Sequence, residues 1–149
     1  LSRVELAGLS HEYFRSFSHG LLASRLYGQV IVARLGLMTQ PDFAAEMADI
    51  LIRLQDVQAA LCLGQHADTL HISLRTKSMD QDAGKIVQQI IVPPGKAGGH
   101  GTMAGGQIPL QGEDIVQNQE YSVRYFPMLP RYYQKWIVKH SQRLHSCTI

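Results

Sequence analysis

The spacing of apolar residues predicts a helix followed by a buried strand near the start of the chain. Leucine and phenylalanine recur at roughly helical intervals over residues 3–24, which indicates an amphipathic helix. Residues 29–35 form a compact β-branched run, typical of a strand that is buried on both faces. Thr39, Pro41 and Asp42 then combine a hydroxyl cap, an early proline and an early carboxylate. This pattern predicts that a second helix begins there.

The middle of the chain predicts two further strands. Residues 57–63 are mostly apolar, and after a polar turn the apolar positions alternate with His71, Ser73 and Arg75. Successive side chains of a strand point to opposite faces, so these three polar residues are expected to share one face.

A short helix and a glycine-rich segment follow. Residues 83–91 predict a helix that a pair of prolines ends. Residues 95–106 are expected to form a loop before a brief strand at 107–110. Residues 112–130 show little periodicity, and residues 131–144 predict a final helix. Alternating helices and strands indicate an α/β fold class, with a mixed β-sheet flanked by helices in a single domain.

Length and charge narrow the possible functions only slightly. The 149 residues suit one domain, no apolar run is long enough to predict a membrane-spanning helix, and the net charge is +2. The chain begins with Leu1, which suggests a piece of a longer protein, and its two cysteines do not indicate a disulfide framework. We therefore expect a cytoplasmic location and no membrane partner. Beyond Glu120 the charged residues are all basic: Arg124, Arg131, Lys135, Lys139 and Arg143.

The most informative segment is the run Gly98-Gly99-His100-Gly101-Thr102. Glycine lets main-chain N–H groups approach a ligand closely, and consecutive N–H groups can form a nest that favours an anion. His100 adds a donor that can become charged near physiological pH, and Thr102 adds a hydroxyl. The run lacks both the Gly-Lys-Ser/Thr of nucleotide triphosphatases and the position of the dinucleotide fingerprint. From its residues alone it is either a phosphate-binding loop or a flexible connection.

The longer stretch Gly98-Gly99-His100-Gly101-Thr102-Met103-Ala104-Gly105 resembles the GGGH-x-x-A-x-G motif of the DHH (Asp-His-His) phosphoesterase family. In that family the motif belongs to the C-terminal, DHH-associated substrate-binding domain. The order of predicted elements over residues 27–112 is similar too, although the first glycine of the motif is Ala97 here. The family includes single-strand exonucleases, nanoRNA and phosphoadenosine phosphatases, and cyclic-dinucleotide phosphodiesterases.

The resemblance implies a substrate-binding domain over residues 27–149, with residues 1–26 as a helix or linker from a missing N-terminal catalytic domain. The implied ligand is a nucleotide or short single-stranded nucleic acid. Arg75 either clamps its phosphate or is an ordinary exposed strand residue. His71 and Ser73 either line the same cleft or occupy ordinary half-exposed positions. The expected substrate-binding residues are Gly98, Gly99, His100, Gly101, Thr102 and Arg75.

Family hydrolysis needs two metal ions, usually manganese, held by Asp and His residues of the N-terminal domain. This chain has no Asp-His-His triplet, so no catalytic residue, metal ligand or cofactor is expected in it. Asp42, Glu46 and Asp49 lie near one helix face and could imitate a metal cluster, but a cap with a solvated acidic face is the favoured interpretation. We expect the isolated chain to be inactive on short oligonucleotides even with manganese. A substrate-binding domain only orients the substrate and does not supply the metal ions that hydrolysis needs.

Two other functions fit the same residues. One is a non-catalytic nucleotide sensor, and the other is an RNA-binding accessory domain, as in the related domain of alanyl-tRNA synthetase. The sequence upstream of Leu1 would separate the enzyme from the sensor. The basic helix predicted at 131–144 is either a solvated cationic face or a track for the backbone of single-stranded nucleic acid.

Overall fold

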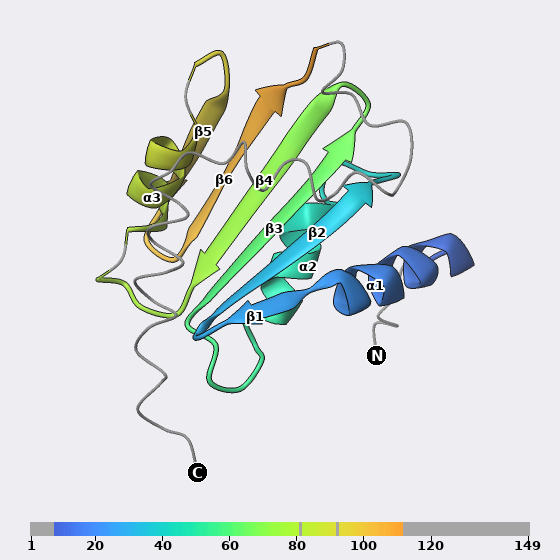
Figure 1. Ribbon diagram of the computed structural model, residues 1–149, viewed down its shortest axis with the longest axis horizontal. Helices are drawn as coiled ribbons and strands as arrows, with labels where there is room; N and C mark the ends of the chain where they lie inside the picture. The colour runs from blue at the N-terminus through green and yellow to red at the C-terminus, as the bar shows by residue number, and fades with distance from the viewer. Residues whose placement is uncertain (1–7, 81, 92, 112–149) are drawn as a thin grey trace, which may run out of the picture.

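The strands of this protein are β1 (Arg25–Tyr27), β2 (Val30–Leu37), β3 (Ala59–His66), β4 (Thr69–Thr76), β5 (Lys96–His100) and β6 (Met103–Pro109). In the computed structural model, which describes residues 8–80, 82–91 and 93–111, they form one sheet in the order β1-β2-β3-β4-β6-β5 (Figure 1). The strands β2 and β3 are parallel, and the other neighbouring strands are antiparallel. The sheet is therefore mixed.

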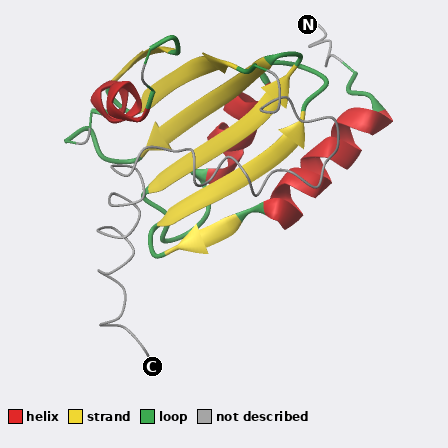
Figure 2. Cartoon of the chain, turned by 45° about the horizontal axis from the view of Figure 1, so that its top comes forward, coloured by secondary structure: helices red, strands yellow, loops and turns green. Residues whose placement is uncertain are grey.

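The helices of the described residues are α1 (His11–Ala23), α2 (Phe43–Leu51) and α3 (Ala83–Ile90). The helix α2 connects β2 to β3, because two parallel strands need a crossover rather than a tight turn. Side chains of α1 and α2 pack against one face of the sheet, and α3 packs against the opposite face near β5 and β6 (Figure 2). The predicted α/β fold, a mixed sheet flanked by helices, is confirmed.

Each face of the sheet builds its own hydrophobic core. The predicted strand near residue 30 is buried on both faces, as expected, because alternate residues of β2 enter different cores. The core on the α3 face includes Val30, Val32, Leu61, Leu63, Leu70, Ile72 and Leu74. The core on the α2 face includes Ile31, Ala33, Leu35, Ala60, Cys62 and Met47.

The start of α2 differs from the sequence prediction. The expected hydroxyl cap was Thr39, but the N-cap is Asp42, whose side chain makes no capping hydrogen bond. The amide of Phe43 donates to the carbonyl of Gln40 at 3.3 Å, so a separate turn precedes the helix. The prediction of the cap was wrong because this extra turn separates Thr39 from the first helical residue. The carboxylate of Asp42 consequently remains exposed at the end of the helix.

The largest departure from the sequence prediction lies in the glycine-rich segment. A loop was expected over residues 95–106, but β5 and β6 form an antiparallel hairpin joined by the two residues Gly101 and Thr102. Gly101 has a φ of 58°, a conformation that two-residue hairpin turns need and glycine adopts readily. Periodicity could not reveal β5, because glycine carries no side chain to alternate. The three-residue strand β1 was missed as well.

Some predicted elements lie outside the described residues. These are the first residues of the helix predicted at 3–24, the segment 112–130 and the basic helix at 131–144. Within the part of the chain that is described, no helix has the length and apolar character needed to cross a membrane.

Candidate functional site

A cleft of about 590 Å³ lies on the α2 face of the sheet. The helices α1 and α2 cover the part of this face formed by β2 and β3. Residues of β4, β5 and β6 line the cleft, and the first turn of α2, with Asp42 and Ala45, contributes one wall. We refer to this site as the β4–β5–β6 cleft.

The strand register arranges the cleft residues in three rows, because directly opposed residues of antiparallel strands share a face. The first row is His71, Gln107 and Lys96. The middle row is Ser73, Gly105 and Gly98. The third row is Arg75 and Met103, followed by His100, which lies beyond the residues that line the cleft. The two outer rows carry the long side chains, and the middle row carries only small ones. Polar and cationic groups therefore lie at both ends of the cleft.

Glycine forms the floor of the middle row. A Cβ atom built on Gly98 would meet nothing within 4 Å, so the space above this residue is open. A Cβ atom on Gly105 would lie 3.1 Å from the carbonyl oxygen of Ile72. A flat floor of this kind lets a ligand approach the main chain closely.

Arg75 is buried at one end of the cleft rather than exposed on the strand. Its side chain is only 11% exposed, and its Nε donates to Oδ1 of Asp49 at 2.6 Å. Its Nη1 donates to Oγ of Ser73 at 3.0 Å and to the carbonyl of Leu74 at 3.1 Å. These contacts hold the guanidinium in one orientation. Within the described residues Nη2 has no acceptor, so its two N–H donors remain for a ligand.

The acidic residues of α2 are partly solvated, as the sequence suggested, since Asp42 and Asp49 are exposed, but two of the three also have partners. Asp49 pairs with Arg75, and Glu46 accepts a hydrogen bond from the hydroxyl of Tyr13 on α1. That hydrogen bond, with burial and the nearby charge, raises the pKa of Tyr13 to about 12. Asp42 instead lines the cleft. In the described residues no three His, Cys, Asp or Glu side chains gather as a metal site would require, so this part of the chain does not fit a manganese pair.

The glycine segment in which a main-chain cradle was predicted forms a hairpin rather than a loop. The residues Gly98, Gly99 and His100 are paired with β6, so they belong to a ladder and not to a free loop. The carbonyls of Gly101 and Thr102 accept hydrogen bonds from the amides of Ala83 and Thr76, at 2.9 Å each. These bonds tie the turn to α3 and to the end of β4.

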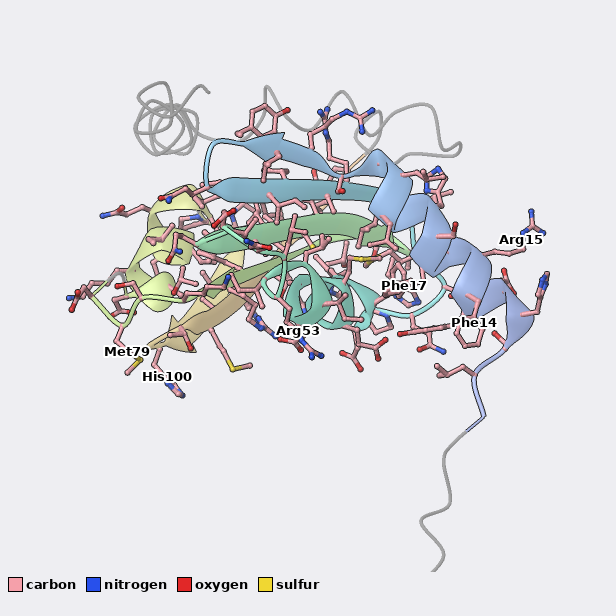
Figure 3. All side chains as sticks on the ribbon, turned by 90° about the horizontal axis from the view of Figure 1, so that it is seen from below. Phe14, Arg15, Phe17, Arg53, Met79 and His100 are labelled. Carbon is pink, nitrogen blue, oxygen red and sulfur yellow. The ribbon has the colours of Figure 1, made fainter. Side chains whose placement is uncertain are left out.

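The predicted site residues are therefore only partly gathered in one place. Gly98, Gly99 and Arg75 line the cleft, whereas Gly101 and Thr102 do not. His100 is exposed at the tip of the hairpin and extends from the sheet on the side of α2 (Figure 3). Its imidazole is thus accessible at the end of the cleft where Arg75 lies.

Two polar side chains that line the cleft, those of Lys96 and Gln107, were missed in the sequence. Lys96 and Gln107 line the cleft opposite each other. Lys96 lies two residues before Gly98, so assigning a strand to this segment would have placed both on one face. His71 and Ser73, for which two interpretations stood open, do line the cleft.

His71 stays neutral more readily in the folded protein than in the unfolded chain. Burial, followed by repulsion from His66, lowers the pKa of His71 from its ordinary value of 6.5, and the carboxylate of Asp42 opposes this shift. The rings of His66 and His71 meet edge to face, with centroids 6.2 Å apart.

This shift predicts a pH dependence of stability. The unfolded chain binds a proton at His71 before the folded chain does, so the stability is complete above about pH 6.5 and declines as the pH falls below it. The variant His71→Gln should lose stability less steeply between about pH 8 and pH 5. Urea unfolding at both pH values measures the difference. Parallel pH curves for the two proteins would contradict the assignment to His71.

Comparisons with known proteins agree with this architecture. The DHHA1 domain model matches residues 27–120. The uncharacterized protein MJ1633 of Methanocaldococcus jannaschii is 27% identical over 121 residues, which cover 80% of this chain and 24% of that protein. The chain therefore spans about a quarter of this curated relative.

Solved structures with a similar chain path also exist. An exopolyphosphatase-related protein from Bacteroides fragilis aligns with a TM-score of 0.57 and 16% identity, over 87% of this chain and 37% of that chain. The C-Ala domain of alanyl-tRNA synthetase from Aquifex aeolicus aligns with a TM-score of 0.46 and 15% identity, over 70% of this chain and 95% of that domain. The first of these likenesses supports the fold. Because the domain model matches more than half of the residues, the chain belongs to the DHHA1 family of DHH-associated domains.

Proposed function

We propose that the β4–β5–β6 cleft binds a phosphate-bearing substrate, either a nucleotide or a short single-stranded nucleic acid, for a metal-dependent phosphoesterase. One observation carries the proposal: donor side chains surround a floor of glycine main chain in a cleft of about 590 Å³. A volume of this size suits a small-molecule ligand. Membership of the DHH-associated family supports a role in gripping the substrate rather than in cleaving it.

Arg75 is the principal phosphate contact in this proposal. Asp49 and Ser73 hold its guanidinium, so little side-chain freedom is lost when the two Nη2 donors bind an anion. His100 approaches the same phosphate from the exposed hairpin tip. The glycine floor between them lets the sugar or base lie close to the sheet.

Catalysis belongs to another domain in this proposal. The described residues offer no metal-binding cluster, and hydrolysis by two metal ions requires ligands that hold both attacking and leaving oxygens. The cleft would present the substrate to such a metal pair. We therefore propose that this chain contributes affinity and orientation to the reaction.

The variant Gly98→Leu tests whether the cleft is the binding site. A Cβ atom at Gly98 meets no atom within 4 Å, so the fold should tolerate leucine while the cleft loses space. We expect a 5′-phosphorylated dinucleotide to bind about ten-fold more weakly, since overfilling a packed site costs about 1–3 kcal/mol. Isothermal titration calorimetry measures the affinity.

Gly8→Leu is the matched control. Gly8 is exposed, and a Cβ atom there would also have nothing within 4 Å, but this residue lies on the chain before α1, outside the cleft lining. The affinity of the control variant should equal that of the unmodified chain. Equal binding by both leucine variants would place the ligand elsewhere on the molecule.

A further inference from the structure

The two cationic ends of the cleft lie in different rows, which are separated along the strands. Lys96 and His100 occupy the same face of β5, four residues apart. A strand rises about 3.3 Å per residue, so their Cα atoms are separated by about 13 Å. Arg75 lies in the row of His100, and Lys96 lies in the row of His71. The cleft therefore offers donors at both ends of an uncharged middle row.

We propose that Lys96 is a second anion contact, which makes the cleft select ligands with two separated phosphates over ligands with one. This inference rests on the proposed function of the same cleft. Arg75 and His100 hold one phosphate at the hairpin end, Gly98 and Gly105 leave room for the nucleoside between, and Lys96 reaches the next phosphate at the other end.

Lys96 is available for this role. It is exposed, it lines the cleft, and within the described residues it forms no ion pair or side-chain hydrogen bond. A lysine without a partner presents its full charge to a ligand, whereas the charge of Arg75 is partly balanced by Asp49. Lys96 therefore gives the first row a cationic donor, as Arg75 does for the third row.

The same end of the cleft also contains a carboxylate. Asp42 lines the cleft at the start of α2, and its charge acts on His71. Because His71 favours its neutral form, Lys96 is the charge that offsets Asp42 at this end. Without Lys96 the end would repel a phosphate. Lys96 should therefore attract a phosphate at this end of the cleft, and Asp42 should repel it.

The test compares two ligands that differ by one nucleotide: adenosine 5′-monophosphate and a 5′-phosphorylated adenylate dinucleotide. For Lys96→Gln we expect about ten-fold weaker binding of the dinucleotide, the loss typical of one hydrogen bond to a charged group. Binding of the mononucleotide should change less than about two-fold. For Asp42→Asn we expect dinucleotide binding to strengthen by about three-fold, because a repulsion between like charges is removed.

Salt dependence supplies a second readout. Loss of one phosphate contact should lower the slope of log affinity against log salt concentration by about 0.7 for the single-stranded ligand. Lys85→Gln is the matched control, because Lys85 is exposed on α3 and outside the cleft lining. It removes the same charge and should leave the selectivity between the two ligands unchanged.

The outcomes separate this inference from the function on which it rests. Equal weakening of both ligands by Lys96→Gln, or no effect on either, would overturn the second contact while leaving phosphate binding intact. Equal affinities of the unmodified chain for the mononucleotide and the dinucleotide would do the same. Failure of the unmodified chain to bind either ligand would overturn the proposed function and this inference together.

Discussion

Replacing Gly99 with alanine should lower the free energy of unfolding by about 3 kcal/mol, whereas the same change at Gly98 should alter it by less than about 1 kcal/mol. The two residues are neighbours in the motif, and each substitution adds the same single methyl group. Their contrast arises from the sheet, because successive residues of β5 face opposite sides.

The cost at Gly99 has two sources. Its φ is 144°, a conformation that residues with a side chain rarely adopt, and a Cβ atom there would lie 2.4 Å from Cα of Ala104 and 2.5 Å from the carbonyl oxygen of Met103. Both contacts involve main-chain atoms of β6, which cannot move without disturbing the hairpin. Gly98 has neither restriction, since nothing lies within 4 Å of a Cβ atom there.

Chemical denaturation of both alanine variants measures this contrast. Gly84→Ala is an informative companion, because its Cβ atom would lie 2.3 Å from the carbonyl oxygen of Gly99 across the interface between α3 and β5. It should destabilise the protein as well. Similar stabilities for the variants at residues 98 and 99 would show that the hairpin is not packed as described.

Replacing Arg75 with methionine should weaken binding of a 5′-phosphorylated dinucleotide by at least about 100-fold. The two N–H donors of Nη2 each make a charge-assisted hydrogen bond to the phosphate in the proposed complex, and such bonds contribute about 1.5–3 kcal/mol. Methionine retains an unbranched apolar stem in the buried site, and because only one partner of the ion pair is removed, the cost to stability depends on how well the remaining carboxylate is solvated. The carboxylate of Asp49 is not trapped without a partner, since its side chain is 55% exposed.

Two further arginine variants sharpen this prediction. Arg15→Met removes the same charge from an exposed residue of α1, which Figure 3 shows pointing away from the sheet. It should change the affinity by less than about two-fold. Arg75→Lys keeps the charge but loses the planar guanidinium, so we expect this variant to bind the dinucleotide weakly as well. Full recovery of binding with lysine would show that charge alone is sufficient and that the orientation imposed by Asp49 and Ser73 is unimportant.

The periodic elements of the fold were predictable because their residues report their own environment. The β-branched run of β2 and the alternation in β4 are local patterns, and both strands occur where those patterns lie. Asp82 precedes the predicted helix at residue 83 and caps α3, with Oδ1 accepting from the amide of Gly84 at 3.0 Å. Such signals depend on neighbours within one or two turns of chain.

For the glycine segment, the sequence predicted residues that line the cleft but not the strand in which they lie, because glycine does not report its environment. Its residues resemble a known substrate-binding motif, which led to Gly98, Gly99 and Arg75, all of which line the cleft. The same glycines hid the strand, because they have no hydrophobic alternation. Lys96 was consequently overlooked, although it shares a face with Gly98.

By itself the sequence determined the α/β class, most of the strands and helices, and the segment around residue 98 as a place of interest. Only the tertiary structure decided that Arg75 is held by Asp49, that Gly101 and Thr102 serve the turn, and that Lys96 faces the cleft. The physical reason is that local patterns specify backbone conformation. A site, by contrast, depends on the register between strands and on a helix 26 residues away in the chain, as the Arg75–Asp49 contact illustrates.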